Sequence, residues 1–104
     1  MFGSGVWSAT GAGTDSGATA TAAAVGTNRF VVTNISGHVD ADSVVTIESP
    51  ASTVLWESKI DISVEGLSFN FNPVIACPLN SAAVGKLSAS SADCQVTISG
   101  YVLG

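Results

Sequence analysis

The sequence predicts an all-β fold, built as an antiparallel β-sandwich. Two observations lead to this prediction. From Asn28 onward, short runs of β-branched and aromatic residues are separated by Gly, Pro, Asn, Asp and Ser, the residues typical of turns. No stretch of about ten residues combines a helical period of 3.6 with helix caps. The 104 residues are enough for one domain and not for two.

Residues 1–27 form a distinct segment of small side chains. The segment holds no Lys or Arg and a single acid, and most of it is Gly, Ala, Ser and Thr. Such a composition buries too little apolar surface to offset the entropy lost on ordering. We therefore expect an extended N-terminal arm that is flexible alone or becomes ordered on a partner. Its large apolar side chains Phe2, Val6 and Trp7 are the candidate contact residues.

Three strands are expected next along the chain. Residues 29–35 are rich in β-branched and aromatic side chains and end at a Ser-Gly pair. In 43–48, Val45 and Ile47 share one face of the expected strand. Residues 53–65 alternate over a longer run, which predicts one buried face and one charged face. The face expected to be buried holds Trp56, Ser58, Ile60, Ile62 and Val64.

The apolar alternation changes its phase after Gly66. The apolar residues of 67–71 have the opposite parity to those of the preceding strand, so a tight turn or bulge is expected at Gly66. Asn72 and Pro73 are expected to end the strand, because proline cannot donate a hydrogen bond to the ladder. The remaining strands are expected at 74–79, 82–89 and 94–102, the last with Cys94, Val96 and Ile98 facing inward.

The number and spacing of these strands define the expected architecture. About seven or eight short strands at regular intervals are typical of a sandwich, and a jelly roll is the form that we expect. The domain boundaries follow: an arm over 1–27 and a β-sandwich domain over 28–104.

The charge of the chain excludes several classes of function. Eight acidic and three basic residues give a net charge of −5, and no basic cluster exists to neutralise the phosphates of nucleic acid or of an anionic membrane. No apolar run is long enough to span a bilayer, and the first residues do not resemble a signal peptide. A soluble protein made in the cytoplasm is expected.

Charged residues make up only 11% of the chain, against about 25% in an ordinary globular protein. A Ser- and Thr-rich β surface is one explanation for so few charges. The alternative is that copies of the chain or a larger partner cover part of the surface, because the cores of interfaces are depleted in Lys, Glu and Asp. We expect the second, that is, a protein that binds and assembles.

No catalytic or metal site is predicted. His38, Asp40 and Asp42 share one side of an extended chain, but three ligands on one flat strand seldom close around an ion. The single histidine has no nucleophile motif beside it. In residues 53–65, neighbouring carboxylates on one face of the expected strand are about 13 Å apart. This distance is larger than the distance between the paired carboxylates of glycosidases. We expect no enzyme and no cofactor.

Cys77 and Cys94 are the only cysteines. Both lie within apolar alternations, so both can face the same core. Reduced thiols are expected in the cytoplasm, whereas oxidation to a disulfide is possible for a protein that leaves the cell. The spacing alone leaves both states open, because it does not give the distance between the two Cα atoms.

Two segments of the C-terminal half carry a resemblance to a known family. They are the run from Leu67 to Asn80, LSFNFNPVIACPLN, and the run from Cys94 to Val102, CQVTISGYV, in which an apolar strand closes with Gly-Tyr. These motifs resemble the small decoration or cement proteins on the capsids of tailed bacteriophages. The resemblance covers about residues 67–103.

The resemblance implies a non-enzymatic structural protein of the virion. Such proteins bind the outer capsid surface and stabilise neighbouring major capsid subunits, often as β-sandwich or jelly-roll homotrimers. The expected partners are therefore the chain itself and the major capsid protein. The expected location is the capsid surface of virions assembled in the host cytoplasm.

A host-facing module is the main alternative. A carbohydrate-binding β-sandwich on a fibre or another surface structure would bind sugars with exposed aromatic side chains, for which Trp56 and Tyr101 are the candidates. Only Tyr101 has the parity of an outward face, since Trp56 shares the parity of the expected core.

Overall fold

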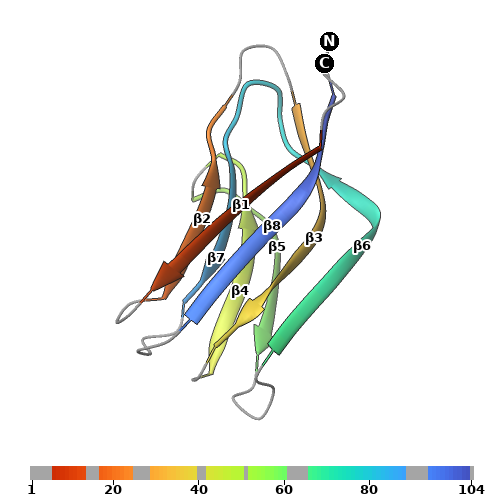
Figure 1. The fold of residues 1–104 in the computed structure, drawn as a ribbon. Helices are drawn as coiled ribbons and strands as arrows, with labels where there is room; N and C mark the ends of the chain where they lie inside the picture. Colours follow the sequence, from red (N-terminus) through yellow and green to blue (C-terminus); the bar gives the residue numbers. More distant parts are fainter. Residues whose placement is uncertain are drawn as a thin grey trace.

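The computed structural model describes residues 6–13, 17–24, 29–39, 42–50, 52–60, 66–88 and 94–103. Over these ranges the chain is all-β and contains no helix, so it has no helix that could cross a membrane. Two antiparallel sheets of four strands lie face to face, as Figure 1 shows. The predicted all-β fold and its antiparallel sandwich arrangement are confirmed.

Eight strands are described. In chain order they are β1 (Val6–Gly13), β2 (Ala18–Ala22), β3 (Arg29–His38), β4 (Ser43–Glu48), β5 (Val54–Ile60), β6 (Gly66–Ala76), β7 (Ala83–Leu87) and β8 (Cys94–Leu103). The first sheet has the order β1-β8-β3-β6, and the second sheet has the order β2-β7-β4-β5. Four of the antiparallel pairs are nested: β4 with β5, β3 with β6, β2 with β7 and β1 with β8.

The alternation of apolar residues determines which side of each strand is buried. Strand β4 has the predicted bounds, and Val45 and Ile47 are fully buried. In β5, Trp56 is half-buried and Ile60 is buried, while Glu57 between them is exposed. Over the described residues these alternations are confirmed, because the inward apolar side chains reach the core between the sheets. Ile62 and Val64, expected on the same buried face, lie outside the described residues.

The prediction that Asn72 and Pro73 end a strand is wrong. Strand β6 continues to Ala76, and Ile75 pairs with Val32 of β3. Pairing of β3 with β6 is irregular between Val32 and Asn34, opposite the proline. Because β6 is the edge strand of the first sheet, Pro73 can interrupt hydrogen bonding on one side only. The irregular pairing with β3 at this point accommodates the missing hydrogen bond.

Aromatic rings pack together on the side of the sandwich between β5 and β6. Trp56 of β5 makes edge-on contacts with Phe69 and Phe71 of β6, at centroid distances of 5.1 and 4.9 Å. All three side chains pack against the buried core. The inward residues of β5 and β6 have opposite parity, and both edge strands contribute to one cluster. The turn or bulge predicted at Gly66 adjoins residues 61–65, which lie outside the described residues.

The opposite side of the sandwich is closed by β1 and β2, which lie where an arm was expected. Ala18 and Ala20 of β2 are buried, and β1 pairs with β8 along its whole length. A Cβ atom at Gly11 would overlap the carbonyl oxygen of Thr19 in β2, and one at Gly13 would overlap another backbone carbonyl. Small residues therefore let the two backbones touch, and a separate N-terminal arm is not confirmed.

Candidate interaction surface

The outer face of the first sheet carries two ordered rows of polar side chains. The register aligns one residue from each strand in each row. One row is Thr10, Thr97, Ser36 and Ser68; the other is Ser8, Ser99, Asn34 and Asn70. We call these eight side chains the hydroxyl–amide array. Their inward-facing neighbours, among them Ile35 and Ile98, are fully buried, so the array lies on the far side of the sheet from the core.

Hydrogen bonds between strands hold parts of this array in place. The hydroxyl groups of Thr10 and Thr97 are 2.9 Å apart and share a hydrogen bond. Asn34 donates from Nδ2 to Oδ1 of Asn70 at 2.8 Å and to the Phe69 carbonyl oxygen at 3.1 Å. The array is therefore a preformed surface and not a set of independent side chains.

The face is nearly free of charge. Arg29, at the first position of β3, is the only Asp, Glu, Lys or Arg residue in the four strands of the first sheet. The strands of the second sheet hold four such residues, namely Glu48, Glu57, Lys59 and Lys86. The low charge of the chain is thus unevenly distributed, and one sheet is almost devoid of it.

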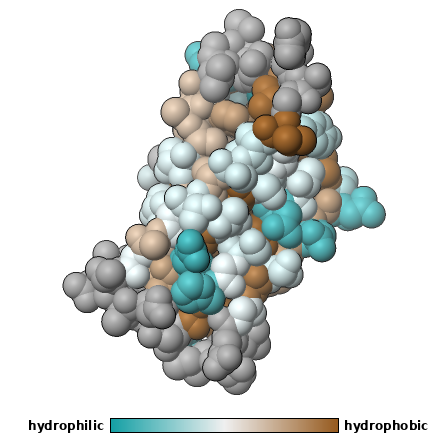
Figure 2. Space-filling model, in the orientation of Figure 1, coloured by the Kyte–Doolittle hydropathy of each residue, from teal (hydrophilic) through white to brown (hydrophobic). Residues whose placement is uncertain are grey.

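One end of this face is hydrophobic. Val6 is 88% exposed at the start of β1, and Leu103 is 47% exposed at the end of β8, where half-buried Tyr101 pairs with Val6. Figure 2 shows a hydrophobic area at this end, close to the two chain termini of Figure 1, and below it a mostly pale surface with several strongly hydrophilic residues in teal. The apolar end and the hydroxyl–amide array together form the candidate interaction surface, which we call the uncharged face.

Only one of the three predicted contact residues is available to a partner in the described part of the chain. Phe2 lies outside the described residues. Trp7 is half-buried, donates from Nε1 to the Tyr101 carbonyl oxygen at 3.0 Å, and has its ring 4.9 Å from that of Phe30. Trp7 therefore packs against its own domain, because it lies on the inward side of β1, while Val6 beside it points outward.

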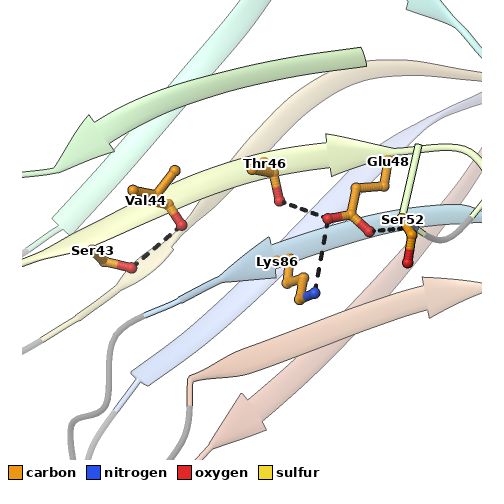
Figure 3. A network of polar contacts seen from close by, with 6 residues as sticks. All are labelled: Ser43, Val44, Thr46, Glu48, Ser52 and Lys86. Carbon is orange, nitrogen blue, oxygen red and sulfur yellow. Dashed lines mark hydrogen bonds and ion pairs between the residues drawn. The ribbon is translucent and has the colours of Figure 1, made fainter. Parts of the chain in front are cut away.

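A network of polar contacts around Glu48 holds the connection between β4 and β5 (Figure 3). The Glu48 side chain is 8% exposed, and its Oε1 accepts a hydrogen bond of 2.8 Å from the Ser52 backbone N–H. Its Oε2 lies 3.4 Å from the donor hydroxyl of Thr46 and 3.8 Å from Nζ of Lys86. Each contact is made within the domain, so this buried carboxylate has a structural role.

We expect Glu48→Gln to lower the free energy of unfolding by about 1–2 kcal/mol, because an amide nitrogen cannot accept the hydrogen bond that one carboxylate oxygen accepts. Chemical denaturation measures the loss. Glu57→Gln is the matched control, since Glu57 is exposed on the next strand and should change the value by less than about 0.5 kcal/mol. Equal effects of the two substitutions would contradict the structural role of Glu48.

Cys77 and Cys94 are both buried as free thiols. The Cys77 backbone N–H donates to the Phe30 carbonyl, and Phe30 pairs with Val102 at the opposite end of β8 from Cys94. At about 3.3 Å per residue, this register separates the two cysteines by about 26 Å, far beyond the reach of a disulfide. An intramolecular disulfide is therefore not formed.

Burial raises the pKa of the Cys77 thiol above its ordinary value of 9.0, and a side-chain hydrogen bond with Ser49 opposes part of that rise. The folded state then holds the Cys77 proton more tightly than the unfolded state does. The free energy of unfolding should be unaffected by this group below pH 9 and should fall as the pH rises through the folded-state pKa. In denaturation curves taken between pH 8 and pH 11, Cys77→Ala should make the decrease of the free energy of unfolding with pH smaller. An unchanged dependence of the free energy of unfolding on pH would contradict the assignment.

The other sequence candidates lie at strand ends and on different strands of the sandwich. His38 ends β3 and Asp42 precedes β4, while Asp40 lies outside the described residues. Across the described ranges, no three His, Cys, Asp or Glu side chains come together as metal ligands. Trp56 faces the aromatic cluster at the β5 side, and Tyr101 is half-buried on the uncharged face.

The fold and this surface define a β-sandwich protein with one almost uncharged outer sheet. No protein-family model, curated protein or solved structure matches the chain. The uncharged face could not be recognised as a surface in the sequence. The signal was present, since the segments 29–35, 67–71 and 94–102 contain one charged residue between them, but only the topology places them side by side.

Proposed function

We propose that the sandwich is a jelly roll. The nested pairs β4–β5, β3–β6, β2–β7 and β1–β8 support this topology, because a jelly roll is one long antiparallel hairpin wrapped into two sheets. The pairs alternate between the sheets as they follow one another along the hairpin. Contacts of β3 with β8 and of β4 with β7 join the pairs within each sheet.

We propose that the chain is a non-enzymatic structural protein of the virion. It binds the outer surface of a bacteriophage capsid as a decoration or cement protein, stabilises neighbouring major capsid subunits, and works as an oligomer, for which the resemblance suggests a homotrimer. The uncharged face is the observation that carries this proposal. A solvent-facing sheet normally carries charges that keep a small protein soluble, whereas the core of a protein interface is depleted in them.

The resemblance to cement proteins adds independent support. Its two segments, 67–80 and 94–102, include most of β6 and β8, which flank β3 in the first sheet. Both strands contribute side chains to the hydroxyl–amide array. The part of the chain that resembles cement proteins is thus also the part that forms half of the uncharged face.

Co-sedimentation with capsids tests the proposed function. Expanded capsids, assembled from the major capsid protein of the phage whose genome carries this gene, are mixed with increasing amounts of the purified chain. We expect saturation at a fixed number of chains per capsid subunit and a higher temperature of capsid disruption. Capsids that neither retain the chain nor gain thermal stability would contradict the proposal.

A further inference from the structure

We propose that the uncharged face packs against a second copy of this chain. This inference rests on one part of the proposed function, that the chain works as an oligomer, and identifies the surface through which the copies meet. A contact between two identical faces has two-fold symmetry, so it gives a dimer, whereas the resemblance suggests a homotrimer. The inference follows from three properties of the face: its charge, its hydrogen-bonding groups and its area.

Charge determines which surfaces of this protein can face each other. Each copy has a net charge of −5, so contact between copies is opposed by repulsion unless the charges lie outside the contact. The strands of the first sheet hold no acidic residue, whereas Glu57 is exposed on the second sheet. Two copies that meet through their first sheets keep the charges of both second sheets away from the interface.

The hydrogen-bonding chemistry of the array complements itself. Each hydroxyl and each amide side chain in it carries both a donor and an acceptor. A surface of such groups can pair with an identical surface, whereas a carboxylate or an ammonium group needs a partner of the opposite kind. The Thr10–Thr97 hydrogen bond between β1 and β8 is an example of this pairing within one copy. The exposed Ser8 and Ser68 offer the same chemistry outward.

The area of the face is sufficient for a stable contact. Four strands about 4.8 Å apart, each about 30 Å long, give a face of about 600 Å². Two such faces bury about 1,200 Å², which is at the lower limit of a standard protein interface. The exposed Val6 and Leu103 add apolar contact at one end of the face. A reversible, concentration-dependent complex is expected.

Introduced charge on this face provides the test. Thr10→Lys and Ser68→Lys each place an ammonium group at an exposed position of the uncharged face, on β1 and β6 respectively. Thr21→Lys is the matched control, because Thr21 is an exposed threonine on β2 of the second sheet and the change in net charge is the same. Sedimentation velocity over a range of concentrations gives the Kd of self-association, and thermal melting verifies that each variant is folded.

We expect wild type and Thr21→Lys to associate with similar Kd values, and Thr10→Lys and Ser68→Lys to raise the Kd by about 100-fold or more, since burying like charges costs several kcal/mol. A monomeric wild type at about 100 μM, or an equal loss in Thr21→Lys, would overturn the inference. If one of the two variants of the uncharged face does not fold, the other variant alone tests the inference. Capsid binding by a monomeric chain would refute this inference and the oligomeric part of the proposed function, but would leave capsid binding standing. An oligomer that does not bind capsids would refute capsid binding and leave this inference standing.

Discussion

Replacing Gly11 by valine is expected to lower the free energy of unfolding by about 3 kcal/mol or more, and the melting temperature by about 12 °C or more. A Cβ atom at this position overlaps the carbonyl group of Thr19, which belongs to the backbone of β2 and cannot rotate away. The substitution therefore forces β1 to separate from β2 or to lose its pairing with β8. Thermal and chemical denaturation measure the change.

Ala12→Val is the control for this substitution. Ala12 follows Gly11 in the same strand, but its side chain points outward and is exposed. The change should leave the free energy of unfolding within about 0.5 kcal/mol of the wild type. If Gly11→Val is as mild as Ala12→Val, then β1 does not pack on β2 in solution, and the N-terminal segment lies outside the sandwich after all.

Trp7→Ala is expected to lower the free energy of unfolding by about 2–3 kcal/mol, somewhat less than the loss of a fully buried tryptophan. The substitution removes the contact with the Phe30 ring and the hydrogen bond to the Tyr101 carbonyl. Trp7→Phe keeps an aromatic ring and should recover more than half of the loss. The measurement is chemical denaturation of the isolated protein, with no partner present.

Val6→Ala separates packing within the domain from contact with a partner. Val6 is 88% exposed beside Trp7, so its truncation should leave the free energy of unfolding within about 0.5 kcal/mol of the wild type. A Trp7→Ala variant as stable as Val6→Ala would contradict the packing of Trp7 against the core. That result would instead favour the expectation that Trp7 is a contact residue for a partner.

The sequence was most informative where large and polar residues alternate. In β4 and β8, buried residues such as Val45 and Ile98 recur at every second position, so both the strands and their inward faces could be predicted. The phase change at Gly66 could be read in the same way, because Phe69 and Phe71 are large enough to reveal their parity.

The N-terminal strands could not be predicted because their alternation is between small residues. Ala18 and Ala20 are buried, yet they alternate with threonine, so the pattern has little contrast in hydropathy. A segment of Gly, Ala and Thr also has the composition of a disordered tail. Strands β1 and β2 are stabilised by the close approach of their backbones, which requires that Gly11 has no side chain. Such a contact leaves no hydropathy pattern in the sequence.

The candidate surface depends on topology more than on composition. The sequence shows that charge is scarce, but the distribution of charge between two sheets appears only when β1, β8, β3 and β6 are placed in one sheet. Residues from 8 to 99 contribute to one array, so no local motif could define it. The state of the two cysteines was left open by the sequence for the same reason, since only the topology places Cys77 and Cys94 at opposite ends of the core.

Hydroxyl-radical footprinting of the wild-type chain bound to capsids, the complex that we propose, tests most directly whether the uncharged face is covered by protein. The reference is the dissociated Thr10→Lys variant, and the reporters are Tyr101 and Leu103 on the face and Leu55 on the second sheet. We predict that Tyr101 and Leu103 are oxidised several-fold more slowly in the capsid-bound wild type than in the dissociated variant. Leu55, which is 40% exposed, should react at the same rate in both samples. Equal oxidation of Tyr101 and Leu103 in both samples, or protection confined to Leu55, would contradict the account.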